Sequence, residues 1–271
     1  MRAWTAFLVL IVVASLAFAG GASESTAEGG EDNSLQYILD KGELVLGLDD
    51  SFPPMGFRGE DGEIVGFDID LAKEVTDRLG VELRLQPIDW DAKVLDLNSK
   101  DIDVIWNGLT ITAEREEQIT FSKPYIANRQ IVIVQAGSGL MTKSDLAGKT
   151  IGLQLGSSAQ DAVESEPEVL DSFAEVARYQ DNVQALLDLE VGRIDAVVVD
   201  EILGRYYISQ KPEVFAVANE YFAEEEYGIG FRKGEVAFRD RVDAILDEMV
   251  EDGAAADISA KWFGEDVLLP R

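Results

Sequence analysis

The stretch Asn107–Arg115 combines a loop of small, hydrogen-bonding residues with an Arg, in a chain that has few basic residues. The apolar run Ile102–Trp106 precedes it, so we expect the loop to follow a buried strand. Backbone N–H groups in such a loop can donate to carboxylate oxygens, while a planar guanidinium binds the same group through two parallel hydrogen bonds. The alternative is a strand-to-helix turn in which Thr112 caps a helix and Arg115 is a solvated surface charge.

A carboxylate occupies a comparable place later in the chain, where Asp200 follows the apolar run Val197–Val199. Arg115 and Asp200 together would complement a molecule with a carboxylate and an ammonium on neighbouring atoms, which describes a free α-amino acid. The alternative for Asp200 is a helix cap before Glu201. Phe52 and Trp90 also lie near predicted strand ends, where they could form apolar walls or a face for a cation, or could simply belong to the core.

Two internal echoes indicate how these side chains are positioned. Val94–Trp106 aligns without gaps with Leu186–Val198, and each copy reads as the end of a helix, a turn and an apolar strand. A second echo pairs Leu44–Leu48 with Thr150–Gln154, two short apolar strands. The two echoes occur in the same order, which predicts two similar α/β lobes.

Helix signals agree with this arrangement. We expect Asp68 to cap a helix that ends at Gly80, and Asp181 or Asn182 to open another before Gly192. Alternating helices and strands predict mostly parallel sheets covered on both faces, with ligands bound beyond the carboxyl ends of the strands. The residues expected there are Asp49–Phe52, Asn107–Thr110, Gly156–Ser158 and Asp200.

Composition narrows the function. The chain has no Cys and no His, which removes thiol nucleophiles, thiolate metal sites and the commonest general base, so we expect no enzyme, no metal site and no cofactor. Its 52 acidic and 23 basic residues give a formal charge of −29. Such a surface repels phosphate backbones and anionic lipids, which argues against nucleic-acid and peripheral membrane binding.

The first residues carry the features of an export signal. Arg2 precedes an apolar run that ends at Phe18, and Ala17–Ala19 offers small residues at a cleavage position. We therefore predict a cleaved signal peptide over residues 1–19, with an uncleaved anchor as the alternative; the absence of Cys excludes a lipid-modified Cys anchor. Residues 20–33 are predicted to form a flexible linker because they contain little to bury.

The mature chain resembles the bacterial extracellular solute-binding proteins of family 3, which serve ABC importers for polar amino acids. Seven blocks in family order carry the resemblance: Gly66–Ala72, Gly108–Thr112 with Arg115, Phe121–Tyr125, Leu146–Lys149, Gly192–Ala196, Tyr227–Gly230 and Lys261–Gly264. The resemblance implies an α/β, two-lobed periplasmic-binding-protein-like fold of type II with two crossing hinge strands. Lobe 1 would comprise residues 34–128 and 226–271, and lobe 2 residues 129–225. Closure around the ligand would signal to a membrane permease, and we expect a periplasmic monomer.

The resemblance also implies roles for individual residues. Arg115 would hold the ligand carboxylate, helped by the backbone N–H groups of Thr110 and Ser157. The Gly108 carbonyl and Asp200 would take the ammonium. The side-chain pocket would be lined by Asn107, Trp90 and Phe52, with Asp49 at its end.

Asp49 stands where members that take cationic side chains place an acid, so the resemblance favours arginine or lysine, with glutamine next. Ala159 and Asn107 depart from residues found in other members, which leaves the identity of the ligand open. The competing class is a periplasmic cyclohexadienyl dehydratase-like enzyme on the same fold, which without His would need a carboxyl group of raised pKa as its general acid. A receptor would need a membrane span after the module, and we expect none.

Overall fold

The computed structural model describes residues 32–271. The predicted signal peptide, residues 1–19, lies outside the described residues, and so does the predicted linker, residues 20–33, apart from Asp32 and Asn33. Within residues 32–271, no helix combines the length and the apolar character that crossing a membrane requires.

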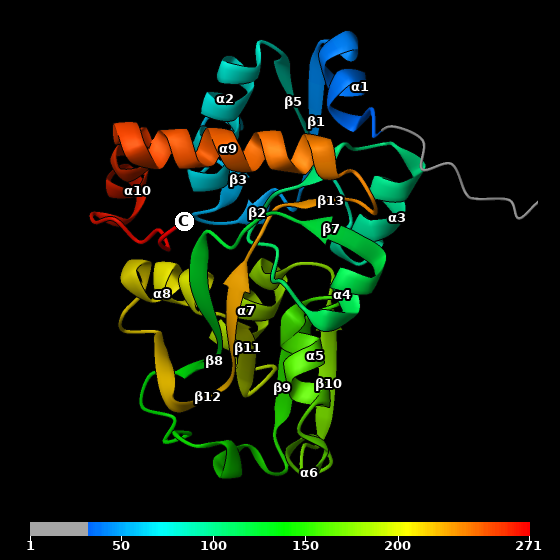
Figure 1. Cartoon of the computed structure of the whole chain (residues 1–271). Coiled ribbons are helices and arrows are strands. Elements are labelled where there is room, and N and C mark those ends of the chain that lie inside the picture. Colours follow the sequence, from blue (N-terminus) through cyan, green and yellow to red (C-terminus); the bar gives the residue numbers. More distant parts are fainter. Residues whose placement is uncertain (1–31) are drawn as a thin grey trace, which may run out of the picture. The chain divides into compact units, whose positions relative to one another are not determined.

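Two five-stranded sheets form the centres of two lobes (Figure 1). In the first lobe the strand order is β5 (Glu82–Pro87), β1 (Glu43–Leu48), β6 (Val104–Ile105), β13 (Gly230–Arg232) and β7 (Ile119–Phe121). A smaller sheet contains β2 (Ser51–Phe52), β3 (Gly56–Arg58) and β4 (Ile64–Val65). The helices are α1 (Ser34–Lys41), α2 (Phe67–Leu79), η1 (Trp90–Ala92), α3 (Lys93–Ser99), α4 (Ala113–Gln118), α9 (Val236–Asp252) and α10 (Ala254–Phe263).

The second lobe has the strand order β10 (Glu175–Tyr179), β9 (Thr150–Gln154), β11 (Ala196–Asp200), β8 (Ile126–Gln135) and β12 (Phe215–Tyr227). Its helices are η2 (Lys143–Leu146), α5 (Ser158–Glu164), α6 (Pro167–Leu170), α7 (Asn182–Glu190) and α8 (Glu201–Gln210). As predicted, Asp181 opens α7, because its side chain accepts a hydrogen bond from the Gln184 backbone.

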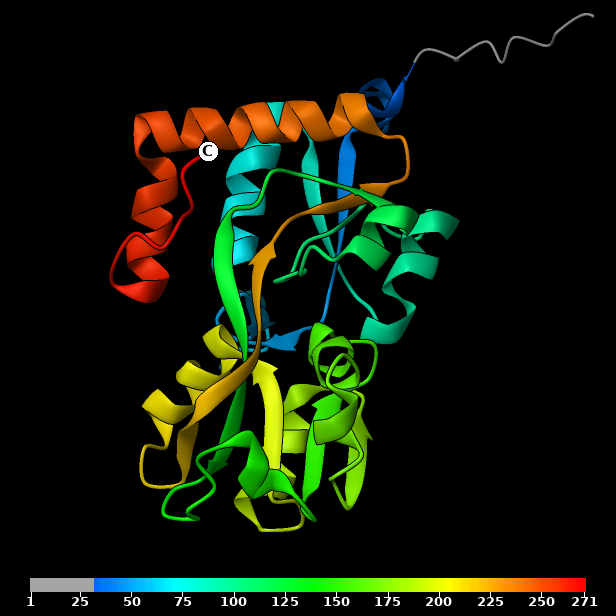
Figure 2. The same cartoon turned by 60° about the horizontal axis from the view of Figure 1, so that its bottom comes forward.

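The long strands β8 and β12 connect the two lobes (Figure 2). They pair antiparallel, from Phe215 opposite Gln135 to Tyr227 opposite Ile126. This is the pair of crossing hinge strands that the resemblance implies. The predicted lobe boundaries, 128/129 and 225/226, fall inside these strands and stay predictions.

Each sheet is parallel over three strands and antiparallel over the other two. β1 pairs parallel with β5 and β6, and β9 pairs parallel with β10 and β11. β13 and β8, in contrast, run antiparallel to their neighbours. Both faces of each sheet are covered. In β1, for example, Leu46 belongs to one core cluster and Val45 to another.

The first echo is structural, as two glycines show. Gly47 of β1 lies beneath the side chain of Ile102, and Gly152 of β9 lies beneath that of Ile194. A Cβ at Gly47 would come within 2.4 Å of Ile102, and one at Gly152 within 2.6 Å of Ile194. Ile102 and Ile194 occupy matching positions in the repeated segments. Each lobe therefore packs an equivalent Ile side chain against the backbone of an equivalent Gly.

The aspartates that follow these Ile residues also have one role in both lobes. The Asp103 carboxylate accepts a hydrogen bond from the Val45 N–H at 2.9 Å, and the Asp195 carboxylate accepts one from the Thr150 N–H at 2.9 Å. Each Asp thereby connects the turn after a helix to a parallel strand of its lobe, β1 in the first lobe and β9 in the second. The repeated Ile-Asp pair in the sequence therefore corresponds to the same packing contact and the same hydrogen bond in both lobes.

The predicted cap at Asp68 is wrong. Gly66 occupies the N-cap position of α2, and the Asp68 carboxylate turns away to accept hydrogen bonds from the Gly108 N–H at 2.8 Å and the Tyr125 hydroxyl at 3.0 Å. Asp68 is buried, and this burial raises its pKa to about 7. Its role is to hold the Gly108 loop, while Gly80 ends the helix as predicted.

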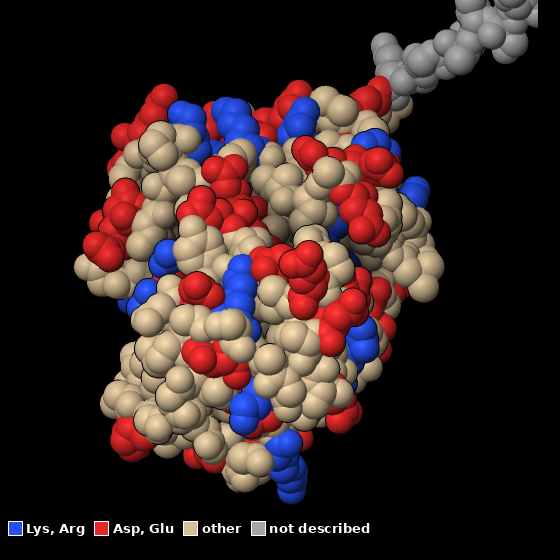
Figure 3. Space-filling view, turned by 90° about the horizontal axis from the view of Figure 1, so that it is seen from below, with Lys and Arg blue, Asp and Glu red and all other residues tan. Residues whose placement is uncertain are grey.

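Charged side chains are spread over the surface. Figure 3 shows Asp and Glu scattered across one face, with Lys and Arg among them. The acidic excess in this view is not gathered in one patch, which fits a role in solubility.

Candidate functional site

A small pocket lies between the two lobes, at the carboxyl ends of β1, β9 and β11. The structure brings all nine predicted site residues together around it, with Ser158, which the sequence analysis expected at this edge, and Gln154, which it did not select. The lining residues are Asp49, Phe52, Trp90, Asn107, Gly108, Thr110, Arg115, Gln154, Ser157, Ser158 and Asp200.

Arg115 forms the cationic side of the pocket. The residue is only 6% exposed, so its interpretation as a solvated surface charge is wrong. Its guanidinium donates to the Thr110 carbonyl oxygen at 2.9 Å and to the Gly156 carbonyl oxygen at 3.3 Å. Thr112 does cap α4, by accepting from the Arg115 N–H, so the helix cap and the buried guanidinium coexist. Burial lowers the pKa of Arg115, although a guanidinium stays protonated.

Asp200 forms the anionic side. Its Oδ1 accepts hydrogen bonds from Asn128 Nδ2 at 2.6 Å, Tyr227 Oη at 2.7 Å and Gln130 Nε2 at 2.9 Å. The residue stands at the first position before α8, yet its side chain makes no capping bond. Burial, together with the nearby Glu225 carboxylate, raises the pKa of Asp200 to about 7. Placing a cation beside it would favour the ionised carboxylate.

Asp49 lines the pocket and is 8% exposed. Its Oδ1 accepts from the Ser51 N–H at 2.9 Å and the Ser51 hydroxyl at 2.6 Å. Its Oδ2 accepts from Gln154 Nε2 of the second lobe at 2.7 Å. Burial raises the pKa of Asp49. All of these donors are neutral, so the carboxylate has no cationic partner among the described residues that donate to it.

Gly108 is required where Phe52 approaches the loop. Its φ is +60°, and a Cβ there would come within 2.8 Å of the Phe52 ring and 3.2 Å of the Tyr227 ring. The neighbouring Asn107 holds the end of β1, because its Oδ1 accepts from the Asp49 N–H at 3.2 Å. Its Nδ2 is buried and has no hydrogen-bond partner in the described part of the chain.

Ser157 opens α5, and its hydroxyl accepts from the Gln160 N–H at 3.3 Å. The Ser157 N–H itself donates to the Gln154 carbonyl oxygen at 3.3 Å, within the turn after β9. A ligand carboxylate would have to replace or share this long bond. The predicted contact between the Ser157 N–H and the ligand stays a prediction.

Lys93 lies near the site but was not selected by the sequence analysis. Its ammonium donates to the Trp90 carbonyl oxygen at 2.9 Å and, across the lobes, to the Gly156 carbonyl oxygen at 2.8 Å. It also lies 5.0 Å from the centre of the Trp90 indole ring. Burial, reinforced by the charge of Arg115, lowers its pKa to about 7. Two cations of the first lobe therefore converge on one carbonyl oxygen of the second.

Fold and site together define a two-lobed binding protein whose lobes meet across a small polar pocket. The family model for bacterial extracellular solute-binding proteins, family 3, matches residues 44–265, and the chain belongs to this family.

Individual relatives and solved structures that resemble this chain are also amino-acid-binding proteins or substrate-binding proteins of ABC transporters. The chain is 35% identical to the L-cystine-binding protein TcyJ of Escherichia coli K12, over 88% of either chain. It is 30% identical to the arginine-binding extracellular protein ArtP of Bacillus subtilis, over 97% of this chain and 98% of ArtP. An ABC uptake transporter substrate-binding protein of Streptococcus pneumoniae, solved with bound histidine, superposes with a TM-score of 0.85 at 36% identity, covering 89% of this chain and 99% of the other.

Proposed function

We propose that this chain captures a free L-amino acid between its two lobes and delivers it to the permease of an ABC importer. The observation that carries the proposal is the placement of buried Arg115 and buried Asp200 around one small pocket. A guanidinium and a carboxylate so placed complement the α-carboxylate and the α-ammonium that every amino acid has. Relatives of this chain are named for binding cystine, arginine and glutamine. All three amino acids carry an α-carboxylate and an α-ammonium, which supports this class of ligand.

Within this class we propose a preference for arginine or lysine, with glutamine next. Asp49 is a buried carboxylate whose hydrogen-bond donors are neutral, so a cationic side chain would give it a charged partner. Phe52 and Trp90 line the same pocket and could pack against an alkyl stem or a guanidinium. We further propose that the protein works in the periplasm as a monomer, after export by the signal peptide.

A dehydratase-like enzyme is the competing proposal. Asp200 has the raised pKa that a general acid would need, but the three hydrogen bonds that its Oδ1 accepts suit an acceptor of cations. Incubation with prephenate and arogenate separates the two proposals, because a binding protein consumes neither.

The proposed function is tested by the mass of any ligand that copurifies, followed by thermal unfolding with each standard L-amino acid and with L-cystine. A ligand that binds only the folded protein raises its stability by about 2.7 kcal/mol at 100 times the dissociation constant. We expect a clear rise for at least one amino acid. Unfolding temperatures that stay constant across the whole set would contradict the proposal.

A further inference from the structure

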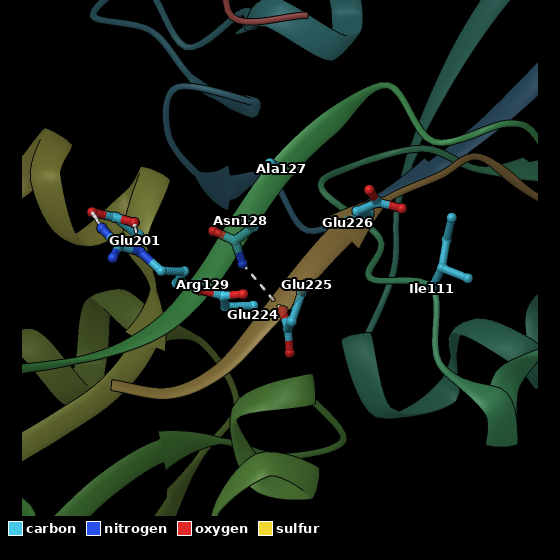
Figure 4. Close-up of a pocket in the computed structure, with 8 residues that line it drawn as sticks. All are labelled: Ile111, Ala127, Asn128, Arg129, Glu201, Glu224, Glu225 and Glu226. Carbon is cyan, nitrogen blue, oxygen red and sulfur yellow. Dashed lines mark hydrogen bonds and ion pairs between the residues drawn. The ribbon is translucent and has the colours of Figure 1, made fainter. Parts of the chain in front are cut away.

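Glu225 sits on the hinge strand β12, opposite Asn128 of β8. Figure 4 shows it on β12, with the hydrogen bond from Asn128 drawn, at the wall of a second hollow beside the hinge strands. Its Oε2 accepts from the Thr110 hydroxyl of the first lobe at 2.9 Å and from the Ser158 hydroxyl of the second lobe at 3.3 Å. One carboxylate oxygen on the hinge therefore binds a side chain from each lobe.

The same oxygen shares two donors with the proposed ammonium partner, Asp200. Asn128 Nδ2 lies 2.6 Å from Asp200 Oδ1 and 3.1 Å from Glu225 Oε2. Gln130 Nε2 lies 2.9 Å from Asp200 Oδ1 and 3.0 Å from Glu225 Oε2. Two neutral amides thus stand between two carboxylates, and neither amide neutralises their charge.

Asp200, Thr110 and Ser158 line the pocket, and Glu225 is connected to it through its bonds to Thr110 and Ser158. The surroundings of the two carboxylates are rich in acceptors. Besides the two carboxylates, the amide oxygens of Asn128 and Gln130 are buried without a donor among residues 32–271. The nearby cation Arg115 is bonded to two backbone carbonyl oxygens. A primary ammonium, which has three donors and no acceptor, is the ligand group that such surroundings favour.

Glu225 also depends on lobe closure. Thr110 and Ser158 lie in different lobes, and their hydroxyl oxygens are 3.0 Å apart in this structure. When the lobes separate, Glu225 cannot keep both bonds, because a carboxylate oxygen bonds only within hydrogen-bonding distance.

We propose that Glu225 is a second anionic partner of the ligand's α-ammonium, acting beside Asp200, and that its bonds to Thr110 and Ser158 link ammonium binding to lobe closure. This inference rests on the proposed function. It adds to the site a residue that the sequence analysis missed, contributed by the hinge itself.

The test compares Glu225→Gln with Glu226→Gln, which removes the same charge from the next residue, an exposed one. Calorimetric titration uses L-arginine, L-histidine and L-cystine, each beside the acid that lacks its amino groups: guanidinopentanoate, imidazolepropionate and dithiodipropionate. For every amino acid that the wild type binds, we expect Glu225→Gln to raise the Kd about 10- to 100-fold, the range for losing a hydrogen bond to a charged group. The deaminated acids should lose no affinity, and Glu226→Gln should leave every Kd unchanged.

Two further measurements separate ligand binding from a structural role. Glu225→Asp keeps the charge and should recover part of the lost affinity. Thermal unfolding of ligand-free Glu225→Gln should occur at or above the wild-type temperature, because the substitution removes one of two neighbouring negative charges. A lower unfolding temperature together with an unchanged Kd would assign Glu225 to hinge structure alone and overturn the inference.

The outcomes also distinguish this inference from the proposed function. If the wild type binds an amino acid and Glu225→Gln binds it equally well, only the role of Glu225 is overturned. The same holds if the amino acid and its deaminated acid lose affinity equally. A wild type that binds no amino acid overturns both.

Discussion

The guanidinium Nη2 of Arg115 lies 3.3 Å from the carbonyl oxygen of Gly156, across the boundary between the two lobes. The Lys93 ammonium meets the same oxygen at 2.8 Å. One peptide group of the second lobe is therefore the meeting point for two cations of the first. The proposed carboxylate clamp is thus itself part of the contact that holds the lobes together.

Adding a methyl group at Gly156 should hinder closure. A Cβ there would lie 2.8 Å from the Asp91 Cα of the first lobe, and backbone cannot give way as a flexible side chain can. Overpacking costs about 1–3 kcal/mol, so we expect Gly156→Ala to raise the Kd of the bound amino acid about 5- to 150-fold.

Gly148→Ala is the matched control for this substitution. Gly148 has a similar φ of +71°, against +68° at Gly156, but nothing lies within 4 Å of its added Cβ. Both variants should lose similar stability from backbone strain, while only Gly156→Ala should keep a large radius of gyration in small-angle scattering with saturating ligand. Equal ligand affinities in the two variants would show that the Gly156 contact does not limit closure.

Removing either charge of the proposed clamp should weaken all accepted amino acids alike. We expect Arg115→Ala and Asp200→Ala each to cost about 2–5 kcal/mol of binding free energy, because each leaves a desolvated ligand charge without its partner. Arg84→Ala, at an exposed ion pair with Glu43, serves as the control and should not change the affinity. Calorimetric titration measures all three; wild-type affinity in Arg115→Ala would remove this residue from the binding site.

Replacing Asp49 should change specificity rather than affinity in general. Asp49→Asn keeps a side chain that can still accept from Ser51 but removes the charge. We expect arginine and lysine to lose their advantage over glutamine, while neutral amino acids bind equally or more tightly. A wild type that already prefers a neutral amino acid to arginine would contradict the specificity proposal while leaving amino-acid capture intact.

Asp68 should make folding stability depend on pH. Its pKa is raised from 3.8 to about 7 by burial, so the folded chain holds a proton that the unfolded chain releases above about pH 4. This contribution to stability is complete below pH 3.8 and is lost as the pH rises through about 7. Asp68→Asn imitates the protonated carboxyl group and should therefore gain in unfolding temperature over the wild type between about pH 5 and pH 8.

The control for Asp68 is Asp77→Asn, which removes a charge from an exposed position of the same helix. Its difference in unfolding temperature from the wild type should stay constant over that pH range. A constant difference for Asp68→Asn as well would mean that the buried carboxyl group does not titrate there.

Sequence reasoning found the pocket through residues that follow apolar strands, since the ends of parallel strands meet at one sheet edge. This reasoning predicted Arg115, Asp49 and Asp200 as site residues. Gln154 was missed because its bond to Asp49 spans 105 residues and both lobes. The predicted echo of β1 in β9 aligned Gln154 with Leu48, one residue off, because the structure makes Gly152 equivalent to Gly47 and thus Gln154 equivalent to Asp49.

The role proposed for Glu225 could not be predicted from the sequence, for a different reason. β12 shifts register between Val217 and Tyr221 and again between Tyr221 and Ala223, so its buried and exposed positions do not alternate regularly. Asp68 was mistaken for a cap because an acid in the first turn suits that role, whereas the hydrogen bonds from Gly108 and Tyr125 arise only in the folded chain.

The central claim is that the protein recognises the α-carboxylate and α-ammonium of a free amino acid. It is tested most directly by titrating wild-type protein with its tightest-binding L-amino acid, with the amine that lacks the carboxylate, and with the acid that lacks the amino group. We predict that each analogue loses about 2–5 kcal/mol of binding free energy, because Arg115 or Asp200 is left without its partner. If either analogue bound as tightly as the amino acid, or if no amino acid bound at all, this account of the site would be contradicted.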